Sequence, residues 1–116
     1  MLPGLKADAD KYQQTYLEDQ ADKMSETNIL QALKIYKALN FKKPSAAISE
    51  KIESLNYKSA CSFIEKDDYK GFRLLQSGLK QNMYVTPGFR YDLGCRYNLL
   101  LFDYLSKILL SEGLKG

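Results

Sequence analysis

The sequence predicts an all-α protein of five or six helices, stacked as a short array of antiparallel hairpins. In several segments apolar residues recur at every third or fourth position, which places them on one face of a helix. Capping residues and prolines precede these segments. Only three prolines and seven glycines interrupt the 116 residues, and no stretch alternates apolar and polar residues for long enough to predict a strand.

Residues 1–24 are polar and allow two interpretations. Leu5, Tyr12 and Tyr16 are spaced so that they would share one face of a weak helix. The segment is equally suited to an arm that becomes ordered only on a partner. The helical domain is therefore expected to comprise residues 25–116.

Firm helix signals begin at residues 25–28, a cluster of capping residues that ends in Asn28. An apolar stripe follows, from Ile29 to Leu39. Pro44 is predicted as the first helical position of the next segment, because its missing N–H costs nothing there. We expect that segment to continue through Asn56 into a helix that contains Tyr57.

Two later helices are predicted from their boundaries. Residues 67–68, Asp-Asp, combine a helix stop with a new N-cap, and Gly78 is expected to end the helix that they open. Thr86 and Pro87 open the last helix. No glycine or proline breaks it near residues 101–103, so it is expected to be long, and Gly113 closes it.

The chain contains an internal repeat with a period of 34 residues, which is the length of a helix–turn–helix repeat. A small residue recurs at Ala60 and Gly94, with aromatic residues three positions to either side. A small side chain at both positions would let a neighbouring helix approach closely. The full set of matches pairs Tyr57, Ala60, Cys61 and Phe63 with Tyr91, Gly94, Cys95 and Tyr97.

Residues 91–97, Tyr-Asp-Leu-Gly-Cys-Arg-Tyr, resemble the first-helix signature of the tetratricopeptide repeat family, and the resemblance covers roughly residues 29–112. It implies helical hairpins whose first helices line a groove for a partner protein. Phe72 departs from the pattern, since it replaces a small residue of the second helix. An irregular helical bundle, similar through amphipathic spacing alone, remains the alternative.

Carried over by register, the resemblance implies an aromatic and nearly neutral groove. The same tyrosines are equally consistent with core positions. The groove lacks the lysine and asparagine arrangement of the family's carboxylate-clamp members, so binding of a chaperone tail is not implied. The implied groove residues are Tyr57, Cys61, Glu65, Tyr91, Cys95 and Asn98.

The last helix offers a second candidate surface, because apolar residues 99–102 are consecutive and cover every side of a helix. A two-layer bundle buries only one side, so the others require a covering chain. Self-association or a place in a larger assembly would supply it. The predicted docking residues are Leu99, Leu101, Phe102 and Leu105.

The composition argues against catalysis and cofactors. The chain has no histidine, and its two cysteines are too few for a disulfide scaffold and badly spaced for zinc. It has no glycine-rich phosphate loop, and the aspartates at 67–68 are better explained as a cap than as a cation site. We therefore predict no enzyme activity, no cofactor and no bound metal.

The expected function is a protein–protein adaptor that holds a partner peptide or helix, and the alternative is an accessory subunit embedded in a larger complex. Nucleic acid is not expected as a partner, since the net charge is only +3 and the lysines are scattered. The longest apolar stretch, residues 99–110, contains Asp103 and Lys107 and is too short to cross a membrane. A soluble intracellular protein is expected, in the cytoplasm or inside an organelle.

Overall fold

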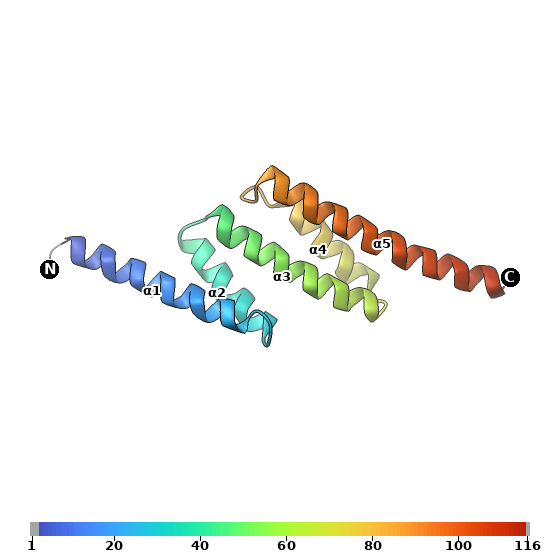
Figure 1. The fold of residues 1–116 in the computed structure, drawn as a ribbon, viewed down its shortest axis with the longest axis horizontal. Coiled ribbons are helices and arrows are strands. Elements are labelled where there is room, and N and C mark those ends of the chain that lie inside the picture. Colours follow the sequence, from blue (N-terminus) through green and yellow to red (C-terminus); the bar gives the residue numbers. More distant parts are fainter. Residues whose placement is uncertain (1–2, 116) are drawn as a thin grey trace. The chain divides into compact units, whose positions relative to one another are not determined.

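The computed structural model describes the backbone of residues 3–115 and the side chains of residues 11–112. Throughout this part of the chain the regular structure is helical, which confirms the predicted all-α class (Figure 1). The chain forms two compact units, Met1–Leu55 and Asn56–Gly116, and the boundary falls within the third helix. The helices are α1 (Pro3–Met24), α2 (Ile29–Lys42), α3 (Ala46–Glu65), α4 (Tyr69–Gln81) and α5 (Pro87–Lys115).

In the first unit, α1 and α2 pack as a hairpin, and α2 runs back along the C-terminal part of α1 (Figure 1). Asn28 caps α2 as predicted, since its side chain accepts a hydrogen bond of 3.2 Å from the N–H of Gln31. Tyr12 and Tyr16 on α1 are exposed, and Leu5 lies outside the described side chains. The core of this unit consists of Ala21, Ala32, Leu33, Tyr36, Ile48, Ile52 and Leu55.

A polar cluster ties α1 to α2 and α3 within the first unit. The hydroxyl of Tyr36 donates a hydrogen bond to Asp22, and Nζ of Lys51 lies 2.7 Å from Glu18 and 3.0 Å from Asp22. The same ammonium lies 5.7 Å from the centre of the Tyr36 ring. Burial acts to raise the pKa of Asp22, but hydrogen bonds from Tyr36 and Lys51 outweigh it and the pKa is lowered.

The start of α3 differs from the prediction. The helix begins at Ala46, and its N-cap is Ser45, whose hydroxyl accepts a hydrogen bond of 3.1 Å from the N–H of Ile48. Pro44 therefore lies outside the helix, because the residue after it supplies the side-chain acceptor that the free N–H groups require. The predicted continuity through Asn56 is confirmed, since α3 runs unbroken to Glu65.

In the second unit, the reversal between α3 and α4 follows the prediction. Asp67 adopts a left-handed conformation with φ of 62°, and Asp68 accepts a hydrogen bond of 3.0 Å from the N–H of Gly71. The predicted end at Gly78 is wrong, because the buried Leu79 continues the apolar stripe and α4 ends only at Gln81.

The last helix begins at Pro87, where the hydroxyl of Thr86 accepts a hydrogen bond of 3.4 Å from the N–H of Phe89. It is one long helix, as expected. Its predicted end at Gly113 is wrong, since the helix continues to Lys115.

The core of the second unit is built around Tyr97. The Tyr57 and Phe72 rings meet it edge-on, with ring centres 5.1 Å and 5.7 Å away, a favourable arrangement for aromatic pairs. Phe72, the departure from the repeat pattern, is therefore a central packing residue. The buried members of this core are Ala60, Phe72, Leu79, Val85, Leu93 and Tyr97.

The two small residues of the repeat have different environments. Ala60 is fully buried, as close packing requires. A Cβ added at Gly94 would have no heavy atom of a neighbour within 4 Å. The expectation that a helix approaches closely at both positions is therefore wrong at Gly94, since α5 turns that position away from the core.

Gly94→Ala is expected to stabilise the protein by about 0.5–1 kcal/mol, because alanine restricts the unfolded chain and is the better helix former. Urea unfolding followed by circular dichroism measures the change. Gly71→Ala is the control and is expected to destabilise, since its Cβ would lie 2.9 Å from the Asp68 carboxylate and 3.0 Å from the Phe63 ring. Destabilisation by Gly94→Ala would contradict the open environment of that position.

Candidate protein-binding surfaces

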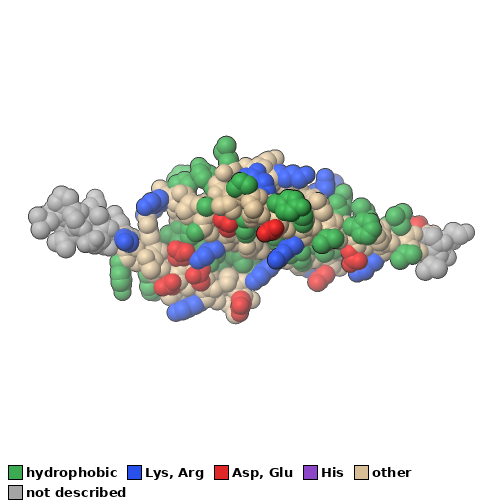
Figure 2. Space-filling view, turned by 45° about the horizontal axis from the view of Figure 1, so that its top comes forward, with side chains coloured by type: hydrophobic (Ala, Val, Ile, Leu, Met, Phe, Trp, Pro, Cys, Tyr) green, Lys and Arg blue, Asp and Glu red, His purple; other side chains and the backbone are tan. Residues whose placement is uncertain are grey.

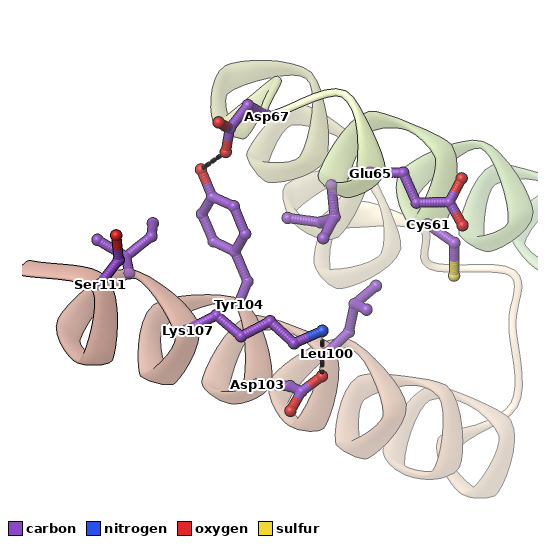
Figure 3. A pocket seen from close by; sticks show the side chains of 10 residues that line it. Cys61, Glu65, Asp67, Leu100, Asp103, Tyr104, Lys107 and Ser111 are labelled. Atoms are coloured by element: carbon purple, nitrogen blue, oxygen red, sulfur yellow. Dashed lines mark hydrogen bonds and ion pairs between the residues drawn. The ribbon is translucent and has the colours of Figure 1, made fainter. Parts of the chain in front are cut away.

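A cleft of about 620 Å³ lies between the C-terminal end of α3 and the C-terminal half of α5, within the second unit (Figure 3). Its apolar part is formed by Ile64 from α3 and by Leu100 and Ile108 from α5. Leu100 and Ile108 are eight residues apart on α5, so they lie on the same side of the helix. The complete lining is Cys61, Ile64, Glu65, Asp67, Leu100, Asp103, Tyr104, Lys107, Ile108 and Ser111.

The charged side chains of the cleft are mainly acidic. Glu65, Asp67 and Asp103 contribute three carboxylates, against the single ammonium of Lys107. That ammonium lies 3.5 Å from the Asp103 carboxylate one turn away on α5 (Figure 3). The cleft therefore has a net negative charge, which favours basic groups on whatever enters it.

Tyr104 connects α5 to the turn after α3. Its hydroxyl donates a hydrogen bond of 2.7 Å to Oδ1 of Asp67, and its ring stacks on Tyr69 with centres 6.3 Å apart. The hydrogen bond to the carboxylate raises the pKa of Tyr104. These contacts fix the position of one wall of the cleft relative to the other.

The six residues implied by the repeat register do not form one surface. Cys61 and Glu65 line the cleft, whereas Tyr57 packs against Tyr97, and burial raises the pKa of its hydroxyl, with a further contribution from Cys61. Asn98 accepts a hydrogen bond of 3.2 Å from the side chain of Gln76 on α4. The other two, Tyr91 and Cys95, are exposed and half-buried positions on α5 outside the cleft lining.

The repeat alignment did not predict the residues of α5 that line the cleft. Leu100, Tyr104 and Ile108 recur at intervals of four residues, and Asp103 and Lys107 form a pair with the same spacing. This spacing indicates one helical face and was the available signal.

The sequence matches no protein-family model, and no curated protein or solved structure is detectably similar to it. The tetratricopeptide resemblance thus rests on the residues quoted for it and stays a prediction. The geometry of the second unit carries the argument about function.

A second surface lies along α5, where several large apolar side chains are exposed. Leu99, Phe102 and Leu105 of the predicted docking residues are exposed, while Leu101 is half-buried and packs against the core of the second unit. Figure 2 shows hydrophobic side chains along the part of α5 that leads to its C-terminal end. Further exposed apolar residues of this helix are Tyr91, Ile108, Leu109 and Leu110.

Neither a metal site nor a membrane-spanning helix is found in the part of the chain that the structure describes. Within residues 11–112, no three or more cysteine, aspartate and glutamate side chains are grouped so that they could hold a metal ion. None of the helices in the described part of the chain is both long and apolar enough to span a membrane.

Proposed function

We propose that this chain is a non-catalytic protein-binding module with tetratricopeptide-like hairpins, and that the cleft between α3 and α5 holds a segment of a partner protein. The observation that carries the proposal is that apolar side chains and three carboxylates line the same cleft. An apolar side chain of the partner would displace water from Ile64, Leu100 and Ile108.

The charges of the cleft indicate the chemistry of the partner segment. Three carboxylates and one ammonium leave a net negative charge beside the apolar side chains. A peptide or helix with lysine or arginine next to an apolar anchor would be attracted to it, and an acidic segment would be repelled. The partner is thus a basic amphipathic segment.

The accessory-subunit hypothesis draws on a different surface, the exposed apolar side chains of α5. It requires a foreign chain that stays permanently on that helix. Oligomeric state distinguishes this hypothesis from self-association, because only self-association occurs in the purified chain alone.

Selection from a library of random displayed peptides on the purified protein tests the proposal. We expect enriched peptides that place lysine or arginine beside a large apolar residue. For a selected peptide, Glu65→Lys is expected to raise the Kd about fivefold to tenfold at low salt, since reversal of one exposed charge changes the interaction by about 1 kcal/mol. Fluorescence anisotropy measures the Kd.

The matched control is Glu26→Lys, which makes the same charge change at an exposed position in the turn between α1 and α2. The control is expected to leave the Kd nearly unchanged, and added salt is expected to reduce the effect of Glu65→Lys. Equal effects of the two variants, or enriched peptides without basic residues, would argue against the cleft as the binding site.

A further inference from the structure

Residues of α5 that lie outside the cleft lining, most of them exposed, follow a heptad pattern. Positions 91, 95, 98, 102, 105 and 109 are separated alternately by four and three residues. This is the spacing with which helices pair in coiled coils. We call these positions the α5 stripe, and they are Tyr91, Cys95, Asn98, Phe102, Leu105 and Leu109.

Most of the α5 stripe lies away from the buried face of α5, although Asn98 contacts α4 through its hydrogen bond with Gln76. Leu93 and Tyr97 are buried in the core of the second unit, whereas Phe102 and Leu109 are 72% and 71% exposed. A helix that packs on the stripe would therefore leave that core intact. The stripe shares no residue with the cleft lining.

The exposed area is of the size that a dimer requires. Leu99 and Leu110 flank the stripe and are also exposed. With roughly 150–250 Å² per aromatic side chain and less per leucine, the exposed parts amount to roughly 600 Å² per copy. A stable interface buries about 800 Å² per partner, so the stripe supplies most of one.

The stripe is complementary to itself when it is reversed about position 100. In an antiparallel pair, Tyr91 of one copy faces Leu109 of the other, and Asn98 faces Phe102. Each layer then combines a larger side chain with a smaller one, and Cys95 with Leu105 completes the set. An isologous dimer requires this property, because the same surface serves both copies. A parallel pair in register would set identical residues opposite each other, so that no layer would combine a larger side chain with a smaller one.

We propose that the α5 stripe binds the same stripe of a second copy, so that the protein is an antiparallel homodimer. The proposal goes beyond the binding of a partner segment in the cleft and uses a separate face of α5. Light scattering coupled to size-exclusion chromatography is expected to give twice the chain mass of 13.3 kDa.

The double variant Phe102→Glu/Leu109→Glu is expected to halve that mass, with the helical circular dichroism signal retained, because both side chains are exposed in the single chain. Leu74→Glu is the matched control, since Leu74 is 73% exposed on α4, and it is expected to leave the dimer intact. If the parent protein is a monomer, the proposal is overturned, whether or not a foreign chain covers the stripe in a complex. A dimer that survives the double variant would also overturn it.

Disulfide trapping tests the direction of the pair. In a Cys61→Ser background the two Cys95 residues of an antiparallel dimer lie ten positions apart, which is about 15 Å along the helix axis and beyond the reach of a disulfide. That variant is expected to remain uncrosslinked under mild oxidation. Adding Leu105→Cys is expected to give a covalent dimer through Cys95 of the other copy. Crosslinking through Cys95 alone would overturn the antiparallel pairing.

Discussion

Phe72→Ala is expected to lower the free energy of unfolding by about 3–5 kcal/mol, the cost of removing a phenylalanine from a packed core. Phe72 is 0% exposed, and its ring meets Tyr97 edge-on. Removal of the ring leaves a cavity at the centre of the second unit, between α4 and α5. Urea unfolding followed by circular dichroism measures the loss.

The control lies two residues away on the same helix. Leu74→Ala is expected to change the free energy of unfolding by no more than about 0.5 kcal/mol, because Leu74 is exposed. Hydrogen exchange of the α4 and α5 amides locates the loss in the second unit. Similar effects of the two substitutions would contradict the assignment of Phe72 to the core.

Tyr36→Ala is expected to have a comparable effect in the first unit, about 3–5 kcal/mol, because Tyr36 is buried among residues of α1, α2 and α3. Tyr36→Phe keeps the ring and removes only the hydrogen bond to Asp22. Its cost is expected to be about 1 kcal/mol. Unfolding in urea measures both, and a Phe variant as unstable as the Ala variant would contradict the packing role of the ring.

The cost of Tyr36→Phe is expected to depend on pH. The pKa of Asp22 is lowered from its ordinary 3.8, so the stability from its contacts is present above that pH and is lost as the pH falls through the folded-state pKa. Burial, and then the bond to Asp22, raises the pKa of Tyr36 above its ordinary 10.0, so its contribution is lost as the pH rises beyond that value. Thermal melts of the parent protein and of the Tyr36→Phe variant measure this. The difference in melting temperature is expected to be constant between the pKa of Asp22 and that of Tyr36, and to shrink at lower and at higher pH. A difference that does not depend on pH would contradict the hydrogen bond.

Helix starts were predictable where one side chain makes the cap. Asn28, Asp68 and Thr86 each accept a hydrogen bond from an N–H group of the first turn, and this chemistry is local. Predictions failed where the outcome depended on packing. Leu79 extends α4 past Gly78 because it is buried, and a small residue at position 94 meets no neighbour.

The repeat alignment predicted the α3 side of the cleft but not its α5 side, again because the outcome depended on how the helices pack. In a repeat of 34 residues, positions 100–111 are equivalent to residues 66–77. In the earlier copy those residues form a turn and most of α4. The chain does not turn there a second time, because no glycine or proline interrupts α5 between residues 95 and 112. The helix instead continues beside the end of α3, and its residues Leu100, Asp103 and Lys107 complete the cleft.

Titration of the ¹⁵N-labelled protein with a selected basic peptide, followed by amide chemical shifts, tests the central claim most directly. The claim predicts shift changes at residues 61–67 of α3 and the following turn and at residues 100–111 of α5. The amides of α1 and α2 should remain unaffected. Changes confined to the exposed side of α4 around Leu74, with none in the cleft, would contradict it.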